Sequence, residues 1–272
     1  MNDVNTQVPE PQRRRGKPFG IGSASGRAFA ELGDDVPAQL LSWLEAGTVA
    51  DGEAIKPGRV YARGDWIIKI FAAGQRWRDR LRPSPALRCA RAHAGLDAVR
   101  TPRPIATLEF PNGRSLVVIE RIDGRTLDAV VADPEAQDGV EAFVHMMVAM
   151  HRARVFHGDL HPDQVLWDGK DWFLLDLDGL RHPLRSLNRR GVIELQWARL
   201  CRSIHPEQLH SVFLRYLEQA GWGWDPVEAW QRILARAAQL HRIAERSTNG
   251  QVPVSPDAFE PSGGPGNRSL SA

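Results

Sequence analysis

The chain has 272 residues, and its formal net charge of +2 reflects a near balance of 35 basic and 33 acidic side chains. This length fits one two-lobed domain or two small domains, and a hydrophobic share of 42% is enough for a substantial core. The small net charge, without a basic stripe interleaved with aromatic residues, argues against a nucleic-acid partner. No apolar run reaches the roughly 18–20 residues that span a bilayer, so we expect a protein that is cytoplasmic or peripherally attached to a membrane.

Both ends of the chain have compositions typical of disorder. Residues 1–20 are polar and rich in proline and arginine, and residues 247–272 are rich in proline, glycine and serine. Between them we expect a β-rich N-terminal part over residues 21–120 and a mostly helical C-terminal part over residues 121–246.

Two β-hairpins are predicted in the N-terminal part. Residues 60–71 place β-favouring side chains on both sides of a Gly-Asp turn at 64–65, and residues 105–119 do so around a Pro-Asn-Gly turn at 111–113. Lys69 is the only charge in the second strand of the first hairpin. A lone lysine there either protects a sheet edge or serves as a functional cation, and we favour the second interpretation.

The C-terminal part carries the residues that phosphoryl transfer requires. This chemistry needs a carboxylate near the attacking hydroxyl, a second carboxylate and an amide to hold magnesium, and a cation on the phosphates. Apolar residues at helical spacing over 139–150 predict a helix that leads into a polar loop containing Asp159, the candidate base. Gln164 and Asp176 offer the hard oxygen ligands that Mg2+ accepts. Asp178 is either a second metal ligand or a turn residue, and we favour the turn.

Each of these loops alone is also compatible with an ordinary turn, because His, Asp, Gly and Pro are all turn formers. Their order, with only a short hairpin turning at residues 168–170 between them, favours phosphotransfer. The stretch from His157 to Gln164, followed by Asp176, resembles the catalytic and metal loops of the protein-kinase-like superfamily, in the His-Gly-Asp form of its small-molecule branch. The resemblance implies an α+β, bilobal protein-kinase-like fold with a small antiparallel-sheet N-lobe, a mostly helical C-lobe, and ATP and Mg2+ between them.

The same resemblance implies roles for N-lobe residues. Lys69 corresponds to the lysine that contacts ATP phosphates, with Lys56 as a weaker competitor. The segment 120–124 resembles the hinge that binds adenine through its backbone, which makes Glu120 and Ile122 candidate nucleotide contacts. Two departures stand out. Gln164 replaces the usual asparagine, and no helix glutamate is evident to pair with Lys69, so either the ion pair is absent or Glu109 or Asp97 substitutes.

Residues 185–190 and 195–204 resemble an asparagine-containing segment and an Arg-Leu-x-Arg-Ser helix of the lipopolysaccharide kinases, in the order that this family shows. Such enzymes phosphorylate 3-deoxy-D-manno-octulosonic acid or heptose of the lipopolysaccharide inner core at the cytoplasmic face of the inner membrane. The resemblance implies a lipid-A-linked sugar acceptor. Arginine-dense stretches at 12–17 and 76–91 either bind anionic lipid headgroups or form a solvated surface.

Two other functions remain open from the sequence. One is a soluble small-molecule phosphotransferase of the aminoglycoside or choline type. The other is a non-catalytic pseudokinase that acts as a binding module.

Overall fold

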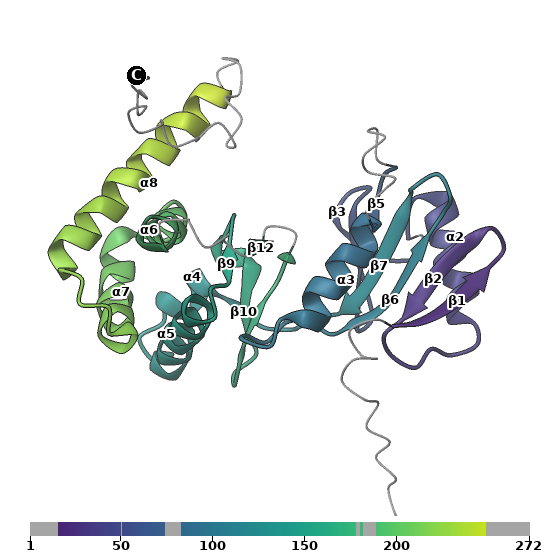
Figure 1. Cartoon of the computed structure of the whole chain (residues 1–272), viewed down its shortest axis with the longest axis horizontal. Helices are drawn as coiled ribbons and strands as arrows, with labels where there is room; N and C mark the ends of the chain where they lie inside the picture. The colour runs from purple at the N-terminus through teal and green to yellow at the C-terminus, as the bar shows by residue number, and fades with distance from the viewer. Residues whose placement is uncertain (1–15, 50, 74–82, 178–179, 182–188, 249–272) are drawn as a thin grey trace, which may run out of the picture.

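The structure is a computed structural model, and it describes residues 16–49, 51–73, 83–177, 180–181 and 189–248. The described chain forms a β-sheet lobe and a helical lobe at opposite ends of the long axis (Figure 1). Each lobe has its own hydrophobic core. The predicted α+β, two-lobed fold is therefore confirmed.

A seven-stranded antiparallel sheet forms the N-lobe, in the order β1-β2-β6-β7-β5-β4-β3. Both predicted hairpins are present, as β4–β5 and β6–β7, and their turns contain Gly64 and Gly113 with positive φ angles of 52° and 88°. The strands are β1 Lys17–Ile21, β2 Ala24–Ala28, β3 Glu53–Lys56, β4 Val60–Arg63, β5 Trp66–Phe71, β6 Pro104–Glu109 and β7 Ser115–Glu120.

Strand β1 corrects the prediction of a disordered segment over residues 1–20. The strand begins at Lys17 and pairs along its whole length with β2, so the prediction is wrong for residues 17–20. Phe19 and Ile21 pack against the core of the lobe, and this long-range contact outweighs the polar composition. Residues 1–15 lie outside the described part of the chain, as does the predicted tail beyond residue 248.

Two helices cover opposite faces of this sheet (Figure 1). Helix α2, Val36–Ala46, packs on the face that receives Ile68 and Ile70 of β5. Helix α3, Pro85–Gly95, packs on the other face, against Ile67 and Phe71. Because side chains alternate along a strand, Lys69 points to the α3 side.

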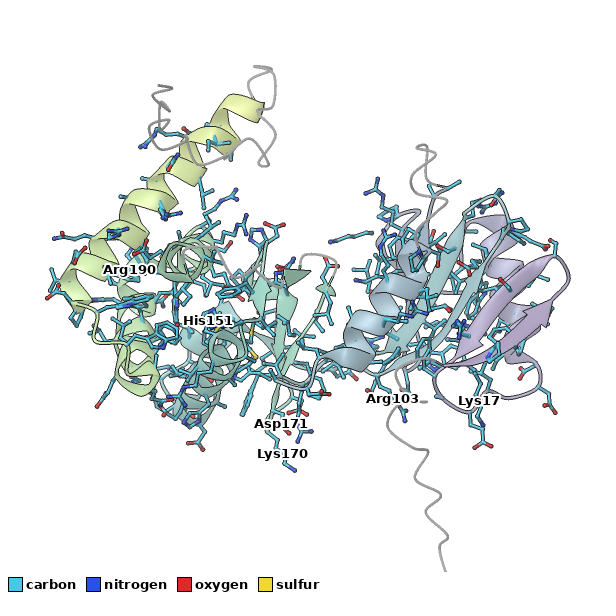
Figure 2. The ribbon with its side chains drawn as sticks, viewed as in Figure 1. Lys17, Arg103, His151, Lys170, Asp171 and Arg190 are labelled. Atoms are coloured by element: carbon cyan, nitrogen blue, oxygen red, sulfur yellow. The ribbon has the colours of Figure 1, made fainter. Side chains whose placement is uncertain are left out.

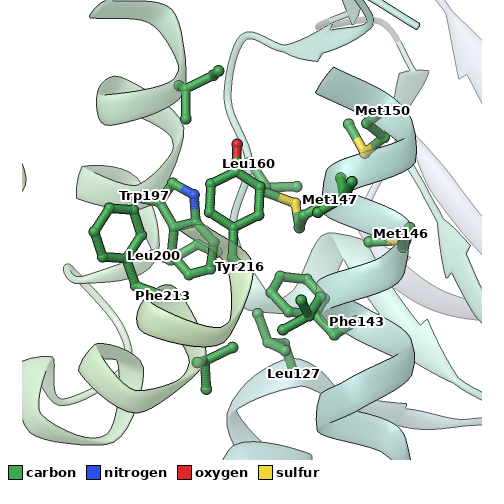
Figure 3. Packing of buried hydrophobic residues seen from close by; sticks show 14 of the residues in the cluster. Leu127, Phe143, Met146, Met147, Met150, Leu160, Trp197, Leu200, Phe213 and Tyr216 are labelled. Carbon is green, nitrogen blue, oxygen red and sulfur yellow. The ribbon is translucent and has the colours of Figure 1, made fainter. Parts of the chain in front are cut away.

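The C-lobe is mostly helical, and its core lies between α5, α6 and α7. Figure 3 shows Phe143 and Met147 of α5 facing Trp197 of α6 and Tyr216 of α7, and all four side chains are fully buried. The helices are α4 Leu127–Val131, α5 Gln137–Arg152, α6 Arg189–Leu200, α7 Pro206–Ala220 and α8 Pro226–Thr248. None of the helices in the described ranges is long and apolar enough to cross a membrane.

A buried polar network joins three of these helices. His151 of α5, inside the helical lobe in Figure 2, has Nδ1 2.7 Å from the Tyr216 hydroxyl and Nε2 2.8 Å from Gln196 Oε1. Tyr216 lies on α7 and Gln196 on α6, so the network fixes the rotation of α6 about its axis. The same helix carries Arg199 to the candidate site.

Short strands of the C-lobe frame the loops between the lobes. β10, Val165–Trp167, pairs with β11, Trp172–Leu174, around the predicted turn at 168–170, and β8, Arg125–Thr126, completes this sheet. β9, Phe156–His157, pairs with β12, Leu180–Arg181. The segment that leads from α3 into β6 reaches down to β11, where the Leu174 N–H donates to the Arg100 carbonyl at 2.9 Å.

Candidate active site

Two loops of the C-lobe form the base of the candidate site, and His157 holds them together. The loop after β9 carries Asp159 and ends in the short 3-10 helix η2, Pro162–Gln164, while Asp176 follows β11. His157 Nε2 lies 2.8 Å from the Asp176 carbonyl, and its Nδ1 accepts the Asp159 N–H at 3.3 Å. Because Nδ1 accepts, Nε2 carries the proton and donates. Burial lowers the pKa of His157, which keeps the ring in this neutral form.

Asp176 receives a lysine from the other lobe. Lys69 Nζ donates to Asp176 Oδ1 at 3.0 Å, and Asp176 has the left-handed backbone φ of 48°, uncommon outside glycine. Burial raises the pKa of Asp176, but the charge and hydrogen bond of Lys69, helped by the charge of Lys56, outweigh it and hold this pKa below the ordinary value. The carboxylate is thus ionised and aimed at the boundary between the lobes.

Helix α3 contributes a histidine beside Lys69 where the family resemblance leads one to expect a glutamate. His93 is 4% exposed on the helix face that meets the sheet. Burial, and next the charge of Lys69, lower its pKa to about 3. The neutral ring adds no charge beside the lysine, and Asp176 supplies the anionic partner that sequence reasoning sought in Glu109 or Asp97.

One cavity of about 860 Å³ between the lobes collects most of the predicted nucleotide residues. Lys69 and Asp176 line it together with Gln164, and Glu120 and Ile122 line it where the chain leaves the sheet lobe. This volume suits a drug-sized ligand. In the structure these five residues line a common space.

Cationic side chains that the sequence did not single out also face this cavity. Arg59 and Arg114 line it beside Lys56, the residue considered as a competitor for Lys69. Gly58 forms the turn between β3 and β4 with a positive φ of 72°, and its N–H donates to the Tyr61 hydroxyl at 3.2 Å.

The side chain of Glu120 forms a hydrogen bond inside the N-lobe. Its Oε2 accepts the Arg103 N–H at 3.2 Å, and its own N–H donates to the Arg103 carbonyl at 2.9 Å. The Arg121 N–H is likewise bonded to the Asp65 carbonyl. The side chain and the N–H of Glu120 are therefore already bonded inside the lobe.

Asp159 does not line the cavity but lies beyond it, with 64% of its side chain exposed. Its Oδ1 is 3.2 Å from His161 Nε2 and 3.8 Å from Arg199 Nε on α6. Because the carboxylate is exposed, an incoming hydroxyl can reach it and transfer its proton to it.

His161 and Gln164 close a reciprocal hydrogen-bonded ring at the start of η2. The His161 side chain accepts the Gln164 N–H, and Gln164 Oε1 accepts the His161 N–H at 3.0 Å. The Gln164 N–H also donates to the His161 carbonyl at 3.0 Å, so the capping box reinforces a turn that the backbone already closes. The distinctive His-x-x-Gln spacing was visible in the sequence, but its reciprocal bonding was not foreseen.

The donor set present suits magnesium. Asp176 and Gln164 supply a carboxylate and an amide oxygen to the same cavity, and Mg2+ takes few protein oxygens when phosphates and water complete its shell. Within the described residues no group of three or more His, Cys, Asp or Glu side chains forms a metal cluster. Asp178 lies outside the described residues, as do residues 76–82 of the arginine-dense stretch and residues 185–188 of the asparagine-containing segment.

A sheet lobe and a helical lobe around one cavity, with a lysine from the first lobe reaching a carboxylate of the second, form the architecture of the protein-kinase-like superfamily. Residues 93–216 match the family described as the lipopolysaccharide kinase (Kdo/WaaP) family. The chain belongs to this family and is an ATP-dependent kinase. The match includes Asp159, Gln164 and Asp176 and begins after Lys69.

Two curated proteins with the name 3-deoxy-D-manno-octulosonic acid kinase, both from Stenotrophomonas maltophilia, are similar to this chain. The one from strain R551-3 is 30% identical over 185 residues, which cover 60% of this chain and 71% of the relative. The one from strain K279a is 30% identical over 151 residues, which cover 50% of this chain and 58% of the relative. Among solved structures, the PknI kinase domain of Mycobacterium tuberculosis matches 66% of this chain and 89% of that domain, at 16% identity and a TM-score of 0.35.

Proposed function

We propose that the protein transfers the γ-phosphoryl group of ATP to a hydroxyl of a lipopolysaccharide inner-core sugar. The acceptor is 3-deoxy-D-manno-octulosonic acid or heptose, and the names of the two similar curated proteins favour the acid. The proposal rests on where the functional side chains lie relative to the cavity. Lys69, Gln164 and Asp176 line the cavity, while Asp159 stays exposed outside it and is tied to Asp176 through His157.

Each residue then has a defined task. Asp159 orients the acceptor hydroxyl and takes its proton as the new bond forms to phosphorus and the bond to ADP breaks. Lys69 has three N–H donors, so it can hold a phosphate oxygen while it stays bonded to Asp176. Gln164 and Asp176 hold Mg2+, with Asp178 as a further ligand or a turn residue, and this ion would neutralise phosphate charge.

Adenine would bind at the opposite end of the cavity. There Glu120 and Ile122 line the cavity where the chain leaves β7. Fixed backbone donors and acceptors aligned before the reaction lower the cost of positioning the nucleotide. We assign the nucleotide contacts on this basis.

A lipid-linked acceptor implies that the enzyme works at a membrane surface. We place it at the cytoplasmic face of the inner membrane, held peripherally. Arg88 and Arg91 of α3, which belong to the arginine-dense stretch, are exposed and carry charges suited to anionic headgroups.

To test the proposal, the purified protein is incubated with ATP, Mg2+ and lipid-A-linked core sugars, and the added phosphate is detected by mass spectrometry of the product. Wild type should add phosphate, and Asp159→Asn should lower the rate by about 100-fold or more, because positioned general bases contribute 10²–10⁴-fold. Asp138→Asn is the matched control, since this exposed aspartate lies in the first turn of α5 and should leave the rate unchanged.

Negative results of this experiment would distinguish the alternative functions. A folded wild type that binds ATP but phosphorylates none of these sugars would reject the acceptor assignment. Turnover of a water-soluble alcohol would then favour the small-molecule branch, and ATP binding without any turnover would favour a pseudokinase.

A further inference from the structure

We propose that His161 is a positioning residue that sets the candidate base and the candidate metal-binding amide relative to each other. One nitrogen of its ring meets Asp159 and the other meets the backbone of Gln164. The inference deepens the proposed function and rests on it, because it gives His161 a task only if Asp159 and Gln164 act in phosphoryl transfer.

The contacts fix the tautomer of the ring. Nε2 faces Asp159 Oδ1 at 3.2 Å, which leaves Nδ1 to accept the Gln164 N–H. A nitrogen that accepts an N–H has no proton of its own, so in the neutral ring the proton is on Nε2 and points at the carboxylate. A single rigid ring therefore contacts both functional groups, Asp159 through Nε2 at 3.2 Å and the Gln164 N–H through the capping box.

The arrangement explains how glutamine can serve where asparagine is usual. Gln164 has one more rotatable bond than asparagine, and its free side chain would sample more positions. Here Oε1 is held 3.0 Å from the His161 N–H, so the capping box removes that freedom. A carbonyl oxygen has two lone pairs, and the second remains for a metal ion.

A role limited to capping does not account for both contacts. A cap requires only an acceptor for the Gln164 N–H, which a short side chain such as asparagine provides. The imidazole is longer, and its far nitrogen lies 3.2 Å from Oδ1 of Asp159, the candidate base. Asp159 is largely exposed, so without His161 the side chain would keep only the longer contact to Arg199 Nε at 3.8 Å.

Two substitutions separate the contacts. His161→Asn places an amide oxygen near the position of Nδ1 and keeps the cap, but it is too short to reach Asp159. His161→Gln places an amide N–H near the position of Nε2 and keeps the donor to Asp159, but it removes the cap. Both are polar and partly exposed like the original residue, and thermal unfolding is measured to verify that each variant folds.

Each variant is examined by two readouts. The first is kcat for phosphate transfer to the lipid-A-linked core sugars. The second is Mn2+ binding, measured by electron paramagnetic resonance, to the complex of the full chain with a non-hydrolysable ATP analogue. The second readout requires neither turnover nor an acceptor.

We expect His161→Asn to lower kcat by about 10–100-fold with Mn2+ affinity close to wild type, and His161→Gln to weaken Mn2+ binding by about 10-fold or more with a smaller loss of kcat. In the Asp159→Ala background, His161→Asn should have no further effect on transfer, because the oxygen that faces Nε2 is gone. Equal effects of the two variants on both readouts, or no effect of either, would overturn the inference.

Failure of the proposed function looks different. If wild type phosphorylates none of the core sugars, the proposed acceptor is wrong, and the kcat comparison is made on the slow transfer of phosphate from ATP to water. The Mn2+ comparison stands unchanged in that case. A normal Mn2+ affinity in His161→Gln would then still overturn the positioning role.

Discussion

Three histidines lie around the site, and the surroundings of each ring determine its hydrogen bonds or its protonation. His157 and His161 each have both nitrogens assigned to named partners. His93 is instead buried beside Lys69, where burial and that positive charge both oppose protonation. The burial of His93 should therefore make the free energy of unfolding depend on pH.

We expect His93 to make the protein less stable in acid. The pKa of His93 falls from 6.5 to about 3 on folding, so below pH 6.5 the unfolded chain binds a proton that the folded protein refuses. Above about pH 6.5 this proton uptake costs no stability. Below it, the free energy of unfolding falls by up to about 1.4 kcal/mol per pH unit as the pH drops toward 3. Urea unfolding of wild type and His93→Leu from pH 7 to pH 4 measures the difference between the slopes.

The exposed His145 of α5 provides the control for this experiment, because its replacement by alanine should leave the slope unchanged. Identical slopes for wild type and His93→Leu would contradict the assignment of the acid loss to His93.

The residue scale also shows where sequence reasoning ends. The positions of Asp159, Gln164 and Asp176 follow from order and spacing along the chain, and Lys69 was identifiable as a lone charge in an apolar strand. The tether from His157 to Asp176 was not, because it depends on how the fold places β9 beside the segment that follows β11. For the same reason the anionic partner of Lys69 was sought in Glu109 or Asp97 of the N-lobe rather than on the opposite lobe.

At the scale of elements, α6 and α8 are joined by a buried carboxylate. Glu194 of α6 is 0% exposed, and it lies 2.9 Å from Arg190 Nε, 3.0 Å from Arg232 Nε and 3.6 Å from Arg236 Nε. Arg190 appears near the contact between the two helices in Figure 2. Because the two later arginines belong to α8, one acidic side chain determines how that long helix sits on α6.

Glu194→Gln should destabilise the protein by about 2–4 kcal/mol, since it removes the anion from three cations and leaves buried groups imperfectly paired. Glu228→Gln is the matched control, because Glu228 meets Arg190 and Arg232 but is 55% exposed, and its loss should cost less than about 1 kcal/mol. Chemical denaturation of both variants decides the point, and equal losses would show that burial of Glu194 has no special weight.

Elements with local signals were predictable, and those that depend on distant partners were not. The hairpins β4–β5 and β6–β7 follow from turn residues between β-favouring runs. β1 pairs only with β2, and its composition resembles that of a disordered end. α2 was not among the predicted elements, although Leu40, Trp43 and Leu44 have helical spacing that could have revealed it.

At the scale of the whole molecule, the two lobes have separate cores, and the contact between Lys69 and Asp176 crosses the cavity between them. The segment before β6 forms a second connection, because Arg100 bonds to Leu174 through the backbone and to Asp171 through its side chain at 3.2 Å. A nucleotide in the cavity would meet both lobes at once. Binding and the coupling between lobes should therefore depend on the same lysine.

The substitution Lys69→Ala should weaken a non-hydrolysable ATP analogue by about 10–100-fold, because charge-assisted hydrogen bonds contribute roughly 1.5–3 kcal/mol. It should also speed amide hydrogen exchange around Asp176 without nucleotide, since the carboxylate loses its partner in the other lobe.

Lys56→Ala is the matched test, because Lys56 lines the same cavity and acts on Asp176 by its charge alone. Calorimetry should give a loss below about 10-fold for this variant, as expected for a screened charge without a direct bond. A larger loss for Lys56→Ala than for Lys69→Ala would transfer the phosphate-binding role to Lys56 and leave Lys69 as a link between the lobes.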